Sequence, residues 1–157
     1  GGSKTAFLDV AAAFPIGQGW DATASYRRGW TSVSSTSALV DSGRLRTDAF
    51  AFDLSKAGAF AVGDRLAFRV MQPLRVANGG FAMTLPISYD YGTGGIGYEQ
   101  RFLSLAPSGR EIDYDIAYSM PFVGGNFDLN AFLRTDPGHI ESAPRDLGGA
   151  LRFTLGF

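Results

Sequence analysis

The residues able to perform chemistry are few and scattered in this sequence. The single histidine, His139, follows Asp136-Pro137-Gly138, and Ser108 stands in a Pro-Ser-Gly-Arg sequence. A Ser–His–Asp triad needs its three side chains in hydrogen-bonding contact, and no Gly-x-Ser-x-Gly elbow accompanies Ser108. We expect His139 to be a solvated loop residue and Ser108 a turn residue. The sequence therefore predicts no enzyme.

Cofactor and metal sites are also not predicted. Residues 92–97, Gly-Thr-Gly-Gly-Ile-Gly, match the letters of a dinucleotide-binding fingerprint, but that site needs a helix N-terminus after the glycines. Residues 98–102 have the pattern of a strand, so we expect a hairpin turn and no cofactor. Asp113 and Asp115 lack the companions that a calcium or zinc site requires. The absence of cysteine excludes thiolate ligands and disulfides.

The composition narrows the class of protein. The 157 residues fit one domain, which we assign to residues 1–157. Charged residues make up 18%, below the roughly 25% of soluble domains, whereas glycine and phenylalanine are abundant, at 21 and 13. The formal net charge of -1 gives no overall attraction to phosphate backbones. A nucleic-acid partner is therefore not expected.

Alternation with a period of two residues dominates the chain, as in strands with one apolar face. It is clearest over residues 111–122, where isoleucine, tyrosine, methionine and phenylalanine share one parity. We expect about nine strands and no helix, with two longer connections at residues 32–43 and 136–147. Tight antiparallel hairpins are predicted at the following glycine-rich sequences: Gly17-Gln18-Gly19, Asn78-Gly79-Gly80, Gly92-Thr93-Gly94-Gly95, Ser108-Gly109 and Gly124-Gly125-Asn126.

Two interpretations of the alternation remain open: a soluble β-sandwich and a membrane β-barrel. No signal peptide and no apolar stretch of about 20 residues is present, but barrel strands barely register in hydropathy. A barrel would place the apolar parity against lipid and the polar parity in the lumen. Aromatic residues near strand ends, as in an interfacial girdle, are Trp20, Trp30, Tyr91, Tyr98 and Phe122. The predicted lumen-facing polar residues are Arg69, Glu111, Asp113, Asp115, Asn126, Asp128, Asn130, Arg134 and Arg152.

Several segments resemble a known family. They are residues 64–76, 85–91 (Leu-Pro-Ile-Ser-Tyr-Asp-Tyr), 105–111 (Leu-Ala-Pro-Ser-Gly-Arg-Glu), 136–139 (Asp-Pro-Gly-His) and the ending 148–157. Together they are similar to the C-terminal translocator domain of autotransporters, above all those with a subtilisin-like protease passenger. The resemblance implies a twelve-stranded outer-membrane barrel, threaded by a helix, that helps move an N-terminal passenger to the cell surface. It also implies a terminal assembly strand with Leu151, Phe153, Leu155 and Phe157 on one parity.

About nine strands fall short of twelve, so we expect an antiparallel transmembrane β-barrel domain that is incomplete at its N-terminal side, the C-terminal part of a larger barrel. Open sheet edges would then result. The expected location is the bacterial outer membrane. The expected partners are outer-membrane lipid, the barrel assembly machinery, the chain's own passenger and the missing strands. The alternatives are a small stand-alone barrel with a structural or adhesive role, and a soluble β-sandwich binding module.

Overall fold

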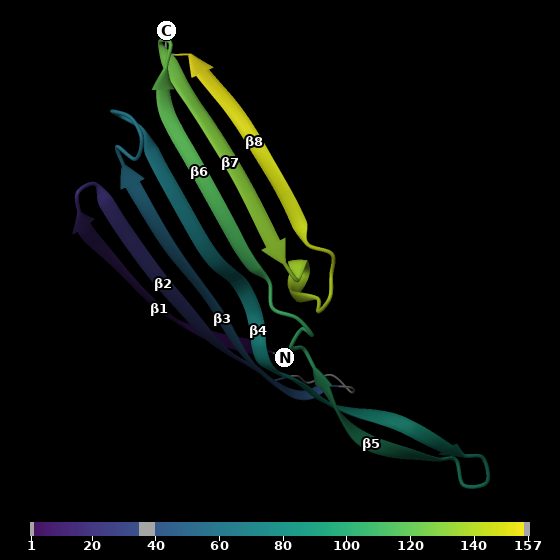
Figure 1. Cartoon of the computed structure of the whole chain (residues 1–157). Coiled ribbons are helices and arrows are strands. Elements are labelled where there is room, and N and C mark those ends of the chain that lie inside the picture. Colours follow the sequence, from purple (N-terminus) through teal and green to yellow (C-terminus); the bar gives the residue numbers. More distant parts are fainter. Residues whose placement is uncertain (1, 35–39, 156–157) are drawn as a thin grey trace. The chain divides into compact units, whose positions relative to one another are not determined.

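The computed structural model describes residues 2–34 and 40–155, and it is an all-β antiparallel structure (Figure 1). A single 3₁₀ turn, η1 (Pro137–His139), interrupts the strands. The eight strands are β1 (Gly2–Gly17), β2 (Trp20–Ser34), β3 (Val40–Ala57), β4 (Arg65–Asp90), β5 (Gly95–Ser104), β6 (Ile112–Phe122), β7 (Gly125–Thr135) and β8 (Asp146–Leu155).

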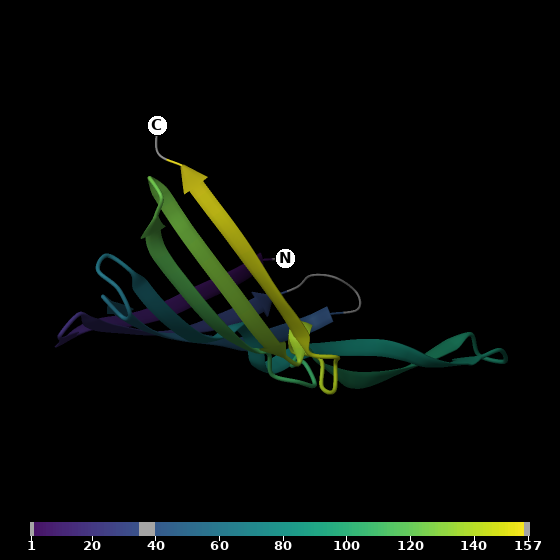
Figure 2. The same ribbon diagram turned by 45° about the horizontal axis from the view of Figure 1, so that its top comes forward.

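The strands form one sheet in the order β1-β2-β3-β4-β6-β7-β8, with β5 paired to β4 outside this path. Figure 2 shows β6, β7 and β8 side by side. The sheet is not closed: in the strand order of the described residues, β1 and β8 each have one neighbour. By their contacts, the residues group into two compact units. The first contains Gly1–Leu8, Arg28–Asp48 and Arg75–Pro107, and the second contains Asp9–Arg27, Ala49–Leu74 and Ser108–Phe157.

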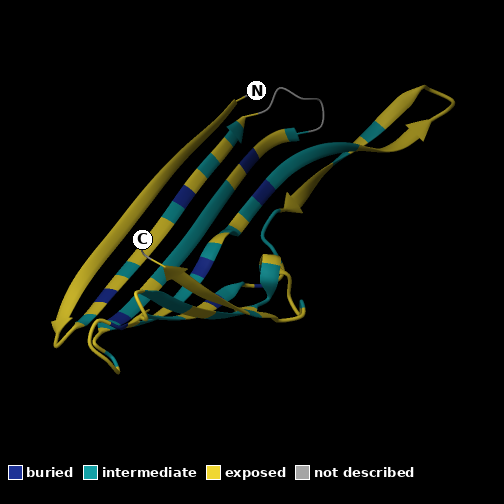
Figure 3. Ribbon diagram, turned by 90° about the horizontal axis from the view of Figure 1, so that it is seen from above, coloured by how far each residue is buried: buried dark blue, intermediate teal, exposed yellow. Residues whose placement is uncertain are grey.

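An apolar core is almost absent. Ala22 is the one buried hydrophobic residue of the described chain, and large apolar side chains such as Leu8, Phe68 and Leu151 are exposed. Figure 3 shows β1 exposed along its whole length. Backbone pairing therefore holds this sheet together, because burial of apolar side chains supplies little of the usual driving force. Within residues 2–34 and 40–155, no helix is long and apolar enough to span a membrane.

The expectation of nine strands is wrong, because β4 runs for 26 residues through the sequence Asn78-Gly79-Gly80 where we predicted a turn. Gly79 has φ 111°, and a Cβ there would collide with the carbonyl oxygen of Arg44. A Cβ at Gly80 would collide with the carbonyl oxygen of Leu103. These glycines allow close approach of neighbouring strands. The first half of β4 pairs with β6, and its second half pairs with β5.

Other predicted turns are confirmed, except Ser108-Gly109, which lies in the loop 105–111 between β5 and β6, strands that each pair with β4 and not with one another. Gln18 and Gly19 have φ values of 53° and 80° between β1 and β2, the positive torsions that two-residue hairpins require. Residues 91–94 form the turn between β4 and β5, where Asp90 accepts a hydrogen bond from the Gly92 amide at 2.8 Å. The glycine-rich sequence 92–97 is thus a hairpin, as predicted. The predicted long connection 32–43 is shorter than expected at both ends, and residues 35–39 lie outside the described part.

Asp64 organises the turn between β3 and β4. Its carboxylate accepts hydrogen bonds from the amides of Ala59, Phe60 and Ala61 at 2.6, 3.0 and 2.9 Å, and from the Tyr118 hydroxyl at 2.7 Å. Asp64 is only 2% exposed. Burial raises the pKa of this carboxyl, but the four donors outweigh it, so the pKa lies below its usual value. The turn therefore depends on the ionised form.

We expect Gly79→Ala to destabilise the protein by about 1–3 kcal/mol, because alanine must adopt a positive φ and its methyl group meets the backbone of β3. Equilibrium urea unfolding of the protein in detergent micelles measures this loss. Gly2→Ala is the matched control, since no atom lies within 4 Å of that site. Equal unfolding midpoints for the two variants would contradict the role of Gly79 in the close approach of β3 and β4.

We expect Asp64→Asn to lower the urea midpoint at pH 7, because the amide cannot accept all four hydrogen bonds. A lowered folded-state pKa gives stability that is complete above the unfolded pKa of about 3.9 and is lost as the pH falls through the folded value. The difference between wild type and variant should therefore shrink below about pH 4. Parallel titrations at pH 7, 5 and 3 test this, and a constant difference would refute it.

Candidate functional site: the polar face of the sheet

The strand register brings most of the predicted polar residues to one face of the sheet. Asp113, Asp115 and Ser119 of β6 lie opposite Met71, Arg69 and Arg65 of β4. Directly opposed residues of antiparallel strands point to the same side. Across β6, β7 and β8, the opposed pairs on this side are Asp113 with Arg134, Asp115 with Phe132, Ala117 with Asn130, Ser119 with Asp128, Pro121 with Asn126, Asn126 with Thr154, Asp128 with Arg152, Asn130 with Ala150, Phe132 with Gly148, and Arg134 with Asp146. We call this side the polar face.

Opposite charges neighbour one another on the polar face. Arg152 contacts Asp128 through Nη2 at 3.0 Å and Nε at 3.1 Å. Asn126 donates from Nδ2 to Asp128 and to the Ser119 hydroxyl, both at 2.8 Å. Arg134 reaches Asp146 of β8 at 3.4 Å. Asp128, Asp146, Arg134 and Arg152 on the β6–β8 part of the face are therefore paired with opposite charges.

Arg134 also lies 3.9 Å from Asp113. Asp113 is buried, and its Oδ1 has no hydrogen-bond partner within the described residues. At 3.9 Å the contact is an ion pair without a hydrogen bond.

The prediction from sequence did not include the polar residues of β1–β3 that extend this face. Asp53 of β3 pairs with Arg69 and accepts a hydrogen bond from Thr23 at 3.2 Å. Arg65 donates to the Ser55 hydroxyl at 2.7 Å. On β1 and β2, Asp9 pairs with Arg27. The available signal was parity: Asp53 alternates with Phe52 and Leu54.

Aromatic rings lie over glycines on neighbouring strands. A methyl group at Gly148 of β8 would lie 2.5 Å from the Phe132 ring of β7, and Arg134 stacks on that ring 4.8 Å from its centre. Phe81 covers Gly43 in the same manner. These pairs explain a glycine inside a strand, where it otherwise weakens packing. These contacts depend on the size of the ring and on the register between two strands, and the sequence of one strand alone does not show that register.

The opposite side of the same strands is apolar. The opposed pairs Phe68 with Ile116 and Leu129 with Leu151 lie there. Phe122 and Phe153 meet edge to face, with ring centres 6.4 Å apart. Leu151, Phe153 and Leu155 of the predicted assembly strand all share this side, and Phe157 lies outside the described residues. Edge strand β8 thus combines an apolar side with a main chain paired only to β7 in the described sheet.

Glu111, predicted on the polar parity of a strand, lies in the loop before β6. Its carboxylate accepts a hydrogen bond from the Gly138 amide at 2.7 Å, and its own amide donates to His139 Nδ1 at 3.0 Å. The Ser108 hydroxyl accepts from the Glu141 amide at 3.1 Å. His139 and Ser108 therefore join two loops, β5–β6 and β7–β8, by local hydrogen bonds.

Within the part of the chain that the structure describes, no group of three or more His, Asp or Glu residues could hold a metal ion. Comparison of the chain with models of protein families, with curated proteins and with solved structures finds no match in any of the three. The geometry itself must therefore indicate what the polar face can do.

The polar face is suited to contact with water. It carries hydroxyl, amide and paired charged groups, and a shallow groove of about 200 Å³ runs along it beside Ala117, Asn130 and Arg152. Arg152 is 75% exposed and Asp128 16%. Paired charges bind a passing peptide weakly, because their electrostatic potentials largely cancel. Such a face can hydrate a channel wall.

We expect the Asp128–Arg152 pair to contribute a small favourable coupling energy, because Arg152 reaches the carboxylate with two donors but is largely exposed. A double-mutant cycle of Asp128→Ala and Arg152→Ala in urea unfolding measures it, and 1 M salt should reduce it. The control cycle combines Asp53→Ala with Arg152→Ala, which pair with other residues. Equal coupling in the two cycles would refute the assigned pair.

Proposed function

We propose that this chain is an outer-membrane translocator and anchor of the autotransporter type, whose sheet forms the C-terminal part of a twelve-stranded barrel. The observation that carries the proposal is the distribution of side chains: apolar residues cover one exposed side, and ion-paired polar residues cover the other. A soluble sheet would bury its apolar side against a second layer. In a membrane barrel, lipid covers that side and water fills the lumen.

The strand order also supports a larger barrel. Seven strands of the described residues follow one another in the sheet path, and β1 and β8 stand at its edges. Single-chain bacterial barrels have even strand numbers, so this path needs further strands for closure. In a twelve-stranded barrel they would pair with β1 and β8, and each edge would gain a complete set of main-chain hydrogen bonds.

In this proposal the polar face lines the pore through which the passenger moves, and the chain performs no catalysis. Neutralised charges and hydroxyl groups keep the wall hydrated and weakly adhesive. During assembly, β8 would pair through its main chain with the barrel assembly machinery, and Leu151, Phe153 and Leu155 would supply side-chain recognition.

The test compares lysine on the two sides of β6 in the full-length protein. Ile116→Lys places a charge on the apolar side, where lipid contact costs about 2–4 kcal/mol, and the adjacent Ala117→Lys places it on the polar face. We expect wild type and Ala117→Lys to give heat-dependent gel mobility from outer membranes and Ile116→Lys to lose it. An epitope tag upstream should reach the cell surface in the first two proteins only.

Three outcomes would overturn the proposal. A monomer that is soluble without detergent would favour a β-sandwich. Equal behaviour of the two lysine variants would contradict the assignment of the faces. A membrane-inserted protein that never exposes the upstream tag would favour a stand-alone barrel over a translocator.

A further inference from the structure

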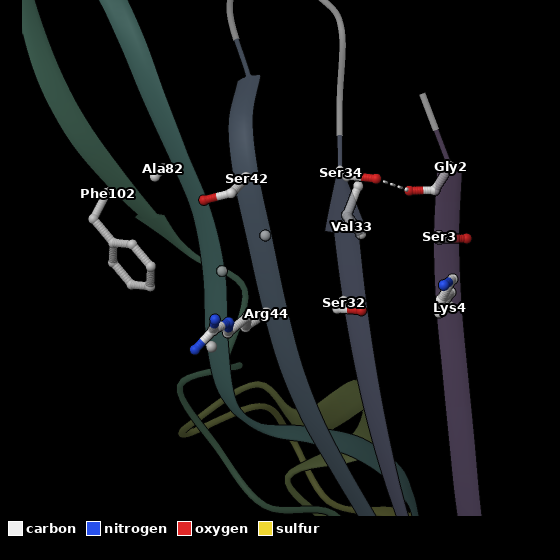
Figure 4. A pocket seen from close by; sticks show the side chains of 13 residues that line it. Gly2, Ser3, Lys4, Ser32, Val33, Ser34, Ser42, Arg44, Ala82 and Phe102 are labelled. Carbon is white, nitrogen blue, oxygen red and sulfur yellow. Dashed lines mark hydrogen bonds between the residues drawn. The ribbon is translucent and has the colours of Figure 1, made fainter.

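A groove of about 700 Å³ lies on the first unit, where the ends of β1, β2 and β3 meet the middle of β4 and the end of β5 (Figure 4). Its volume falls in the range of small-molecule sites. Lys4 and Arg44 supply its two cations, and no acidic residue of the described chain lines it. Gly43, Gly79 and Gly80 also line the groove, with the Phe81 ring close to Gly43 and the backbones of β3 and β5 close to the other two.

The register sets the order of the polar groups across the groove. Thr5 bonds to Thr31 at 2.9 Å, and Ser34 donates to the Gly2 carbonyl at 3.4 Å. These contacts place Lys4 opposite Ser32 on β2.

The hydrogen bond from Thr23 to Asp53, and the position of Thr47 beside the place where a Cβ on Gly29 would lie, place Ser32 opposite Arg44 on β3. Adjacent strands are about 4.8 Å apart, so the backbone of Ser32 lies between those of Lys4 and Arg44, which are about 10 Å from one another. Lysine and arginine side chains are long enough to reach one phosphate group from these positions, beside the Ser32 hydroxyl.

On the side of the sheet that carries Ser32 and Arg44, the polarity of the side chains changes along β2 and β3. On β2, Ser32 is followed by Trp30, Arg28 and Tyr26, and on β3, Arg44 is followed by Arg46, Asp48, Phe50 and Phe52. Away from the groove, a hydroxyl group comes first, cationic residues and an aromatic ring come next, and apolar residues come last. This is the sequence of environments from a lipid headgroup into hydrocarbon.

In the cationic part of this series, between the hydroxyl and the apolar residues, cations outnumber anions. Arg28, Arg46 and Arg75 accompany one carboxylate, Asp48, which lies 3.5 Å from Arg75. The Nε atom of Arg46 is buried and has no hydrogen-bond partner within the described residues.

Phe102 of β5 forms an apolar wall of the groove and is 67% exposed. Figure 4 shows its ring on the side of Arg44 away from Lys4. We infer that this groove binds the phosphorylated headgroup of an anionic membrane lipid, with Lys4, Ser32 and Arg44 on the phosphate and Phe102 beside its apolar part. This inference rests on the membrane location proposed above.

The experiment uses the full-length protein in phosphatidylcholine vesicles, with and without about 10 mol% diphosphorylated lipid A. The temperature at which the heat-modifiable band is lost reports binding. We expect lipid A to raise it for wild type, and the double variant Lys4→Gln/Arg44→Gln to need at least tenfold more lipid A for half of the shift. The charge-matched control, Lys56→Gln/Arg101→Gln, removes two cations outside the groove and should respond as wild type does.

A further variant and further conditions distinguish failure of the groove assignment from failure of the proposed function. Arg44→Lys, which keeps the charge, should retain most of the response. Insertion into phosphatidylcholine without any added effect of lipid A, or equal losses in both double variants, would overturn the groove assignment and leave the proposed function standing. Failure to insert into either vesicle would overturn both. Complete competition by millimolar inorganic phosphate would assign the groove to free phosphate and overturn the lipid assignment.

Discussion

Main-chain hydrogen bonds between antiparallel neighbours are the interaction on which this structure depends. Ala22 is the one buried apolar residue of the described chain, so the usual hydrophobic core does not hold the strands. Each strand of the path instead satisfies its backbone groups on its neighbours. Such ladders contribute little net free energy in water but become obligatory where water is absent. The apolar side of the sheet and its backbone pairing therefore belong to the same proposed environment.

The pairing also determines the chemistry of the two sides. Because side chains alternate, a strand with apolar residues at every second position presents its charges on one side only. The register then decides which charges meet: Asp128 meets Arg152, and Asp53 meets Arg69. The resulting wall is polar but nearly neutral. That property suits a hydrated pore, in which a fixed excess of charge would retain a peptide of opposite sign.

Glycine has a structural role in this sheet beyond its turns. Gly79 and Gly80 let β4 approach the backbones of β3 and β5, and Gly148 receives the ring of Phe132. Gly79 and Gly80 also line the groove of the first unit. In each case the missing side chain is what permits the close contact.

The sequence alone determined the all-β class, most strands and the membership of the two faces, because side-chain parity follows from local backbone geometry. Of the predicted polar residues, those within β4, β6 and β7 and Arg152 of β8 share one face, and Glu111 instead stabilises a loop. Only the tertiary structure decided that Asn78-Gly79-Gly80 is the middle of a strand, since glycine serves both a tight turn and the close approach of neighbouring strands. It also decided the partners of Asp53 and Asp64, because these depend on register and on residues distant in sequence.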